Sequence, residues 1–174
     1  NHDTLTNLPN RILLMDRIER AISKAKYERE KVAVVFVDLD HFKLINDSLG
    51  HHVGDRLLLE ISSRLSNCIR SQDTVARLGG DEFILVLTEQ IDEENVSSII
   101  QRLLESIAQP WINDEHEYSL SCSVGISCFP KDGDTAEVLL QCADAAMYKA
   151  KDAGRNTFHL YRPELSVAAT GRLE

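Results

Sequence analysis

A short and uninterrupted apolar run, residues 32–37, restricts the fold of this chain more than any other feature. The run is rich in valine and stops at Asp38, which predicts a central strand covered on both faces of its sheet. A segment with helical periodicity precedes the run, and Asn10 is placed to cap that helix. We therefore expect a sheet with helices packed against it.

Further along the chain, β-prone and helical segments follow one another. Gly79 and Gly80 separate two β-prone runs, and because glycine tolerates positive φ, this pattern predicts a hairpin. The order β-α-β-β-α-β in the middle of the chain predicts an α+β fold of the split βαβ (ferredoxin-like, palm-type) kind, with an antiparallel central sheet flanked by helices. The expected helices cover about residues 10–28, 42–48, 53–68, 93–108 and 135–153, and the remaining strands 74–78, 82–87, 118–129 and 157–161.

Length and charge limit the function. The 174 residues favour one domain, which we expect over residues 1–161, with a linker or appended tail over 162–174. The net charge of -9 argues against binding a nucleic-acid polymer, but it leaves room for one small anionic ligand held by local cations. Neither a membrane span nor a signal peptide is evident, so we expect no direct membrane contact. The four scattered cysteines form no zinc or disulfide pattern, which favours the cytoplasm.

An acidic group is predicted at one end of the sheet. Asp38 ends the central strand, and Asp81 and Glu82 occupy the tip of the hairpin. Carboxylates brought together there repel one another unless a cation lies between them, and oxygen ligands favour Mg²⁺. Such a site suits phosphoryl or nucleotidyl transfer. The alternative is ordinary turn and strand-end chemistry, with Asp40 capping the helix that begins near Phe42.

Five sequence motifs then carry a family resemblance. The heptad RLGGDEF at residues 77–83 resembles the signature of the GGDEF family, the bacterial diguanylate cyclases. The other four motifs follow the family's order: DTLTNLPNR at 3–11, FVDLDHFKLIND at 36–47, GHHVGD at 50–55 and YKAKDAGRN at 148–156. The resemblance implies the split βαβ sheet and the condensation of two GTP into cyclic di-GMP and two pyrophosphates, in a metal-dependent reaction at the interface of two domains.

The resemblance also implies a role for each acid. The side chains of Asp38 and Asp81, with the Leu39 carbonyl, would ligate Mg²⁺ or Mn²⁺. Asp38, Asp81 and Glu82 would form the catalytic set, in which Glu82 orients or deprotonates the attacking 3′-hydroxyl. Which acid takes the proton stays open.

Substrate contacts are implied on three segments. Phe42 and Lys43 begin a helix whose N–H groups would meet phosphate, although Lys43 alone is equally a solvated helix residue. Lys151 and Arg155 would bind the β- and γ-phosphates, although cations at a helix C-terminus also complement its dipole. Contacts are also implied for Gly79 and Gly80.

A second pair would select the base. The resemblance implies that Asn46 and Asp55 read the guanine edge, with Asp55 as a buried acceptor that ATP would leave unpaired. The alternative for both residues is turn and cap chemistry. His51 and His52 match no zinc motif and are interpreted as loop residues.

Arg70 and Asp73 resemble the family's inhibitory product site. An arginine can pair with guanine O6 and N7, and an aspartate can accept from the amino edge. The alternative is a helix-end ion pair of little consequence. Arg102 is a weaker candidate for a further contact.

Assembly and a second function follow from the same resemblance. Because the product joins two nucleotides symmetrically, two copies must meet, and we expect a transient homodimer. Residues 162–165 resemble the junction that leads into an EAL phosphodiesterase domain, so an alternative is a catalytically weak GTP-binding regulator of an attached cyclic di-GMP phosphodiesterase. Cyclisation of a single nucleotide is a third possibility. Leu173-Glu174 belong to that junction or to an appended tail.

Overall fold

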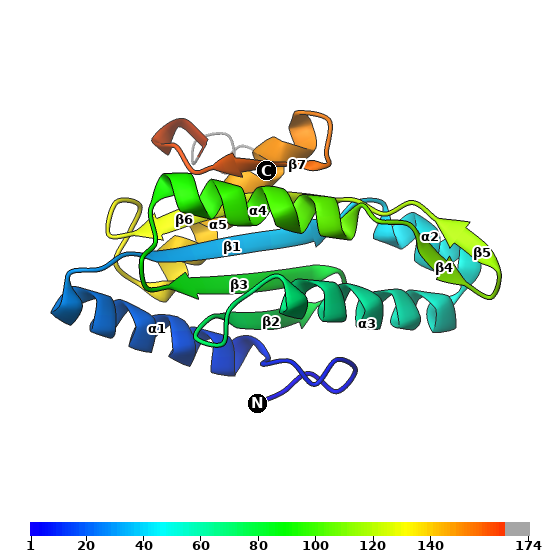
Figure 1. Ribbon diagram of the computed structural model, residues 1–174, viewed down its shortest axis with the longest axis horizontal. Coiled ribbons are helices and arrows are strands. Elements are labelled where there is room, and N and C mark those ends of the chain that lie inside the picture. Colours follow the sequence, from blue (N-terminus) through cyan, green and yellow to red (C-terminus); the bar gives the residue numbers. More distant parts are fainter. Residues whose placement is uncertain (166–174) are drawn as a thin grey trace.

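A five-stranded sheet in the order β2-β3-β1-β6-β7 forms the centre of the computed structural model, which describes residues 1–165 (Figure 1). Residues 166–174 of the expected linker, which include Leu173-Glu174, lie outside the described residues. The strands are β1 (Val32–Leu39), β2 (Thr74–Gly79), β3 (Glu82–Thr88), β6 (Cys122–Phe129) and β7 (Thr157–Leu160). The first four in the sheet run antiparallel, as the split βαβ plan predicts, whereas β7 is a parallel addition beside β6.

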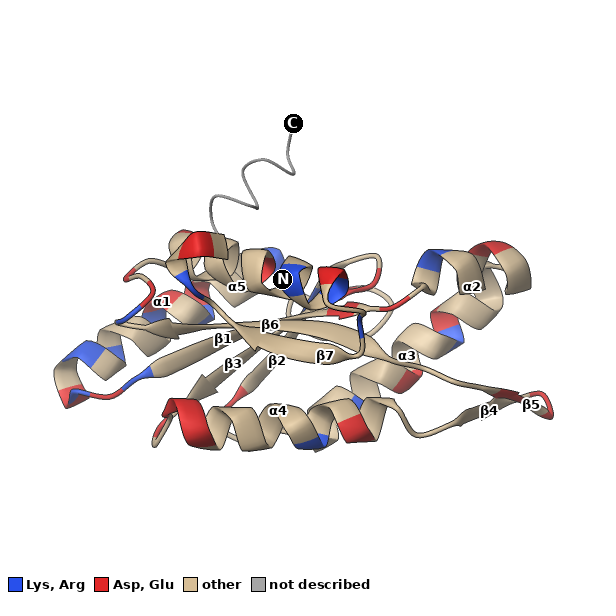
Figure 2. Ribbon diagram, turned by 90° about the horizontal axis from the view of Figure 1, so that it is seen from above, with Lys and Arg blue, Asp and Glu red and all other residues tan. Residues whose placement is uncertain are grey.

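Helices cover both faces of this sheet. They are α1 (Arg11–Glu28), α2 (Phe42–Leu49), α3 (His51–Asn67), α4 (Glu93–Ile107) and α5 (Ala136–Asp152). Helices α3 and α4 contribute to the hydrophobic cluster on one face, and α1 and α5 to the cluster on the other (Figure 2). All eight residues of β1 are buried, which confirms the prediction of a central strand covered on both faces.

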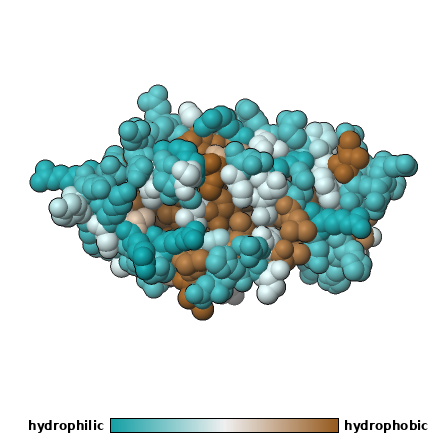
Figure 3. All heavy atoms as spheres, turned by 60° about the horizontal axis from the view of Figure 1, so that its bottom comes forward, coloured by the Kyte–Doolittle hydropathy of each residue, from teal (hydrophilic) through white to brown (hydrophobic). Residues whose placement is uncertain are grey.

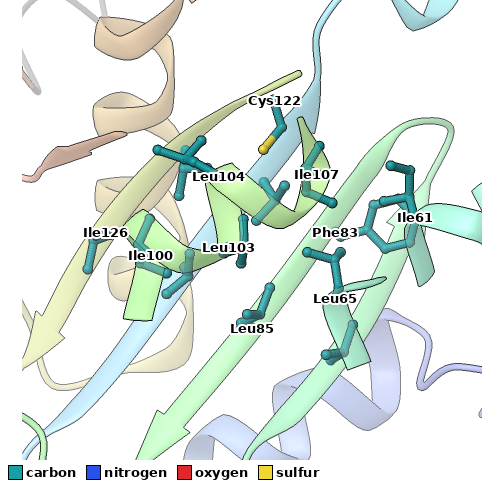
Figure 4. Packing of buried hydrophobic residues seen from close by; sticks show 14 of the residues in the cluster. Ile61, Leu65, Phe83, Leu85, Ile100, Leu103, Leu104, Ile107, Cys122 and Ile126 are labelled. Carbon is teal, nitrogen blue, oxygen red and sulfur yellow. The ribbon is translucent and has the colours of Figure 1, made fainter. Parts of the chain in front are cut away.

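Alternation along β1 assigns each side chain to a face. Ala33, Val35 and Val37 belong to the cluster under α3 and α4, whereas Val34 and Phe36 belong to the cluster under α1 and α5. Figure 4 shows the first cluster, where side chains from α3, α4 and β3 meet. The face in Figure 3 is mostly hydrophilic, with separate hydrophobic patches.

Helix α5 packs unusually close to β6. A Cβ built on Gly125 would lie 2.0 Å from the Ala143 carbonyl oxygen and 2.1 Å from the Met147 nitrogen. Only a residue without a side chain permits this approach, so backbone contact sets the height of α5 above the sheet.

Local signals explain several boundaries. The Asn10 side chain accepts from the Leu13 N–H at 3.2 Å, so the predicted cap of α1 is confirmed. His51 and His52 are not loop residues, because they form the first turn of α3. Across residues 1–165, no helix combines the length and the apolar character that crossing a membrane requires.

A small hairpin replaces the start of the strand expected over 118–129. β4 (Trp111–Asn113) pairs with β5 (His116–Tyr118), and the Trp111 and Tyr118 rings lie 5.5 Å apart between their centroids. The turn uses Asp114 and Glu115, both at positive φ, rather than the glycine that usually marks such a turn. Figure 2 shows this hairpin projecting beyond the end of α3.

Candidate active site

The end of β1 and the β2–β3 hairpin place three acids together. Asp38 lies opposite Glu82 in the register of β1 and β3, and the Leu39 N–H donates to the Asp81 carbonyl oxygen at 3.3 Å. Gly79 and Gly80 adopt positive φ at 143° and 49° within a bulged turn. The turn thus folds Asp81 back toward the strand end, where the sequence predicts a cation site.

Asp38 is the most perturbed of the three acids. It follows the alternation of Val34 and Phe36 and so faces α5, where its Oδ2 accepts from Lys151 Nζ at 2.9 Å. Its Oδ1 is buried and has no hydrogen-bond partner within the described chain. Burial raises the pKa of Asp38 to about 6, with the Asp81 charge acting in the same direction and Lys151 opposing it.

Glu82 shares this environment. Burial raises its pKa above the ordinary value, and the charges of Asp38 and Asp144 add to the effect. Glu82 also lines a cavity of about 270 Å³ whose apolar lining includes Phe36 and Leu140. A carboxyl with a raised pKa beside a second buried acid suits the uptake or release of a proton.

The donor set suits a hard cation. Within residues 1–165, no three His, Cys, Asp or Glu side chains converge into a ready-made metal site. A magnesium ion, however, commonly binds through one or two carboxylates and completes its shell with water and phosphate. The unpartnered Asp38 Oδ1, the neighbouring Asp81 and the Leu39 carbonyl fit that requirement.

Lys151 and Arg155, the two cations predicted to bind phosphate, differ in whether their charge is paired. Lys151 lies in the last turn of α5 and pairs with Asp38. Arg155 follows α5 at φ 65°, is exposed and forms no ion pair with any described residue. Both lie near the acidic end of the sheet, but only Arg155 has its charge uncompensated.

The predicted base-reading residues lie where α2 meets α3. Asn46 Nδ2 is 3.2 Å from His51 Nδ1, and a Cβ on Gly54 would lie 2.2 Å from Asn46 Oδ1. Gly54 therefore lets Asn46 lie over the start of α3, next to Asp55. Asp55 is exposed, so its expected burial is wrong for the ligand-free chain. Phe42, half-buried, and Lys43, exposed, begin α2 as expected.

Arg77 fixes the glycine turn, a role that the sequence pattern alone does not predict. Its Nε and Nη2 donate to the Gly80 carbonyl oxygen at 3.1 and 2.9 Å, and its Nη1 donates to both Asp3 carboxylate oxygens at 3.0 Å. Asp3 and Arg77 are 74 residues apart, and no local pattern links them.

Asp40 does not cap α2. His41 occupies the N-cap position and makes no side-chain cap, whereas Asp40 is buried and accepts from the Ser121 and Ser123 hydroxyls and the Asn156 N–H. A short-range pattern suggests the cap, but the actual partners come from distant segments.

Arg70 and Asp73 form a clip in which Asp73 is buried and Arg70 is partly exposed. The Arg70 guanidinium donates to both Asp73 carboxylate oxygens and to the carbonyls of Thr88 and Glu89. The Asp73 side chain is 1% exposed and also accepts from the Arg70 and Thr88 N–H groups. Its expected contact with product therefore conflicts with its burial.

A cavity of about 400 Å³ lies beside this clip. Arg70 and Arg102 both line it, with Asn95 and Ser98. The structure thus brings Arg102, the weaker candidate, to the same cavity as Arg70.

Comparison with known proteins agrees with this architecture. The chain matches the family model described as diguanylate cyclase, GGDEF domain, over residues 1–157. It is 45% identical over 173 residues to MucR of Pseudomonas aeruginosa, a bifunctional diguanylate cyclase/cyclic di-GMP phosphodiesterase. That match covers 99% of this chain and 25% of MucR, so the chain spans about a quarter of the length of this relative.

Two solved structures confirm the fold class. The GGDEF domain of TpbB (YfiN) from Pseudomonas aeruginosa gives a TM-score of 0.93 at 38% identity, covering 98% of this chain and 99% of that one. The GGDEF domain of DgcB from Caulobacter crescentus, in complex with cyclic di-GMP, gives 0.85 at 26% identity, covering 91% and 94%.

Proposed function

Because the chain belongs to the diguanylate cyclase (GGDEF domain) family, we propose that it condenses two GTP into cyclic di-GMP and two pyrophosphates. In each half-reaction the 3′-oxygen of one GTP bonds to the α-phosphorus of the other, the bond to pyrophosphate breaks, and a base takes the hydroxyl proton. The buried Asp38 carboxylate carries the proposal, because its Oδ1 lacks a partner beside the acids of the glycine turn. The four unpaired cysteines suit a cytoplasmic setting.

The three acids would have different roles in the reaction. Asp38 and Asp81, with the Leu39 carbonyl, would hold Mg²⁺ or Mn²⁺, which lowers the pKa of the attacking hydroxyl and offsets phosphate charge when bound. Glu82 is the preferred proton acceptor or orienting group, because burial has already raised the pKa of its carboxyl.

The remaining residues hold the nucleotide. Phe42 and Lys43 present N–H groups at the start of α2, and Asn46 with Asp55 select guanine at the junction of α2 and α3. The exposed Asp55 would become buried only when the base covers it.

Phosphates would lie between the glycine turn and the end of α5. The N–H groups of Gly79 and Gly80 would contact the phosphates from the turn, and Arg155 would contact them from the end of α5. Lys151 joins Arg155 there once it leaves Asp38.

Two copies must face each other, because each domain supplies one GTP and the product is symmetric. We propose a transient homodimer. Cyclic di-GMP would act as inhibitor at the cavity lined by Arg70 and Arg102. The GGDEF domain of DgcB, a neighbour in structure, is known in complex with cyclic di-GMP. Asp73 would hold Arg70 in position rather than contact the product.

A second candidate is a catalytically weak GTP-binding regulator of an attached phosphodiesterase. The bifunctional name of MucR, of which this chain spans about a quarter, supports this second candidate.

Separation of the products formed from labelled GTP with Mg²⁺ distinguishes the two functions. We expect cyclic di-GMP and pyrophosphate from the wild type, no turnover by Asp81→Ala, and normal turnover by Asp134→Ala, which removes an exposed loop acid. Binding of GTP without product would favour the regulator, and near-normal turnover by Asp81→Ala would reject the metal assignment.

A further inference from the structure

One buried carboxylate outside the acidic group joins three strand ends. Asp40 is 6% exposed and directly follows β1. Its Oδ2 accepts from Ser121 Oγ at 2.5 Å and from the Asn156 N–H at 3.1 Å, and its Oδ1 accepts from Ser123 Oγ at 2.6 Å. The serines flank the first residue of β6, and Asn156 immediately precedes β7. Asp40 therefore fixes where the chain passes from α5 into β7.

The segment that Asp40 holds is strained. Gly154, Arg155 and Asn156 all adopt positive φ, at 105°, 65° and 48°. Non-glycine residues adopt this conformation at a cost and keep it only where their surroundings hold them. On the helix side, the Arg155 N–H donates to the Ala150 carbonyl oxygen at 3.0 Å. On the sheet side, the Asn156 N–H has the Asp40 bond.

The direction of Arg155 depends on this turn. Its guanidinium forms no ion pair within residues 1–165, so no described charge directs it from the side-chain end. The backbone from which the Arg155 side chain extends is anchored on one side to α5 and on the other to Asp40. A backbone that is fixed before a ligand binds limits where the guanidinium can reach, so less freedom is lost on binding.

We propose that Asp40 is a positioning residue that aims Arg155 at the terminal phosphates of the nucleotide without touching the nucleotide itself. This inference rests on the proposed function. Two other roles are possible for such a residue: direct participation as a metal ligand or base, and stabilisation of the fold alone. Each makes a different prediction.

The test is a double-mutant cycle on nucleotide binding. Affinity for 3′-deoxy-GTP, which lacks the attacking hydroxyl, is measured by calorimetry with Mg²⁺, and affinity for GMP is measured in parallel. Asp40→Ala and Arg155→Ala should each weaken 3′-deoxy-GTP binding by about ten- to a hundredfold, because the contact between the Arg155 guanidinium and the terminal phosphates is lost. GMP binding should stay unchanged. The double variant should bind no more weakly than Arg155→Ala alone.

Two further variants separate positioning from the other roles. Asp40→Asn can still accept from the Asn156 N–H and donate to the Ser123 hydroxyl, so it should restore most of the affinity, whereas loss of a metal ligand or base would not be restored. Ser123→Ala removes a buried partner of Asp40 but spares the Asn156 bond, so it should lower the melting temperature and keep the affinity. If Asp40→Ala does not fold, Asp40→Ser replaces it in the cycle, because serine removes the carboxylate oxygen that accepts from the Asn156 N–H but keeps a polar hydroxyl in the buried position.

Three results would overturn the positioning role. The first is an additive loss of 3′-deoxy-GTP affinity in the double variant, and the second is an equal loss of GMP affinity. The third is an Asp40→Asn variant that binds 3′-deoxy-GTP as weakly as Asp40→Ala. Wild-type chain that turns over GTP, with Arg155→Ala impaired and Asp40→Ala unimpaired, would overturn this inference alone. Wild-type chain that neither binds nor converts GTP would overturn the proposed function together with it.

Discussion

The ionisation of Asp38 should make the metal-free domain less stable as the pH rises. Its carboxyl has a pKa of about 6 in the folded chain against an ordinary 3.8, because burial disfavours the charged form. The folded state therefore holds this proton more tightly than the unfolded state does. The resulting stability is present below about pH 4 and is lost as the pH rises through about 6.

The magnitude follows from the size of the pKa difference. A difference of about two pH units, at about 1.4 kcal/mol per unit, corresponds to about 3 kcal/mol. Little of this is screened by solvent, because the Asp38 side chain is 8% exposed. Asp38→Asn cannot ionise, so its stability relative to the wild type should rise by about 3 kcal/mol between about pH 4 and 7.

Urea unfolding with a metal chelator, at a series of pH values, measures this difference directly. Asp134→Asn, at an exposed position, should show no such trend and serves as the matched control. Lys151→Met should extend the loss of stability to higher pH, since the ammonium that lowers the Asp38 pKa is gone. The reasoning would be refuted if the stability of Asp38→Asn relative to the wild type changed by no more than about 0.5 kcal/mol across the whole pH range.

Three further predictions concern other parts of the molecule. Asp55→Ala should narrow the preference for GTP over ATP in a binding titration yet leave the melting temperature unchanged, because Asp55 is exposed in the free chain; unaltered discrimination would contradict its role. Arg102→Ala should weaken inhibition of turnover by added cyclic di-GMP without unfolding the domain, and equal inhibition of wild type and Arg102→Ala would exclude that cavity. Arg70→Ala should also destabilise the domain, because it leaves the buried Asp73 charge without its cationic partner. Gly125→Ala should destabilise the domain by about 3 kcal/mol in urea unfolding, since α5 must move. Gly133→Ala, whose nearest contacts would be the side chains of Val138 and Leu139, should destabilise the domain far less. Equal losses of stability in the two variants would contradict the close contact between α5 and β6.

The sequence predicts what depends on periodicity and local turn chemistry. The strand over residues 32–37, the glycine hairpin and the Asn10 cap follow from such signals, and the structure confirms them. The small hairpin at Asp114 and Glu115 escapes prediction, because its turn reaches positive φ without glycine.

Contacts between distant segments lie beyond such patterns. Asp40 lies two residues before a helix and so resembles a cap, but its partners are Ser121, Ser123 and Asn156. Asp73 resembles an exposed partner of arginine until the β3 end covers it. Asp40 and Asp73 are each buried by segments that lie far from them in the sequence, so the spacing of residues along the chain does not predict their burial.

The small β4–β5 hairpin offers a practical opening for engineering. It pairs only within itself in the described sheets and is tied to α3 through Arg56, which contacts Asn113 and Asp114. Its tip is exposed and does not contribute to the acidic group or the arginine-lined cavity. Exposed hairpin tips of this kind tolerate inserted sequence well. A peptide tag or small fluorescent reporter inserted between Asp114 and Glu115 could therefore follow the meeting of two copies while leaving the chemistry of each untouched.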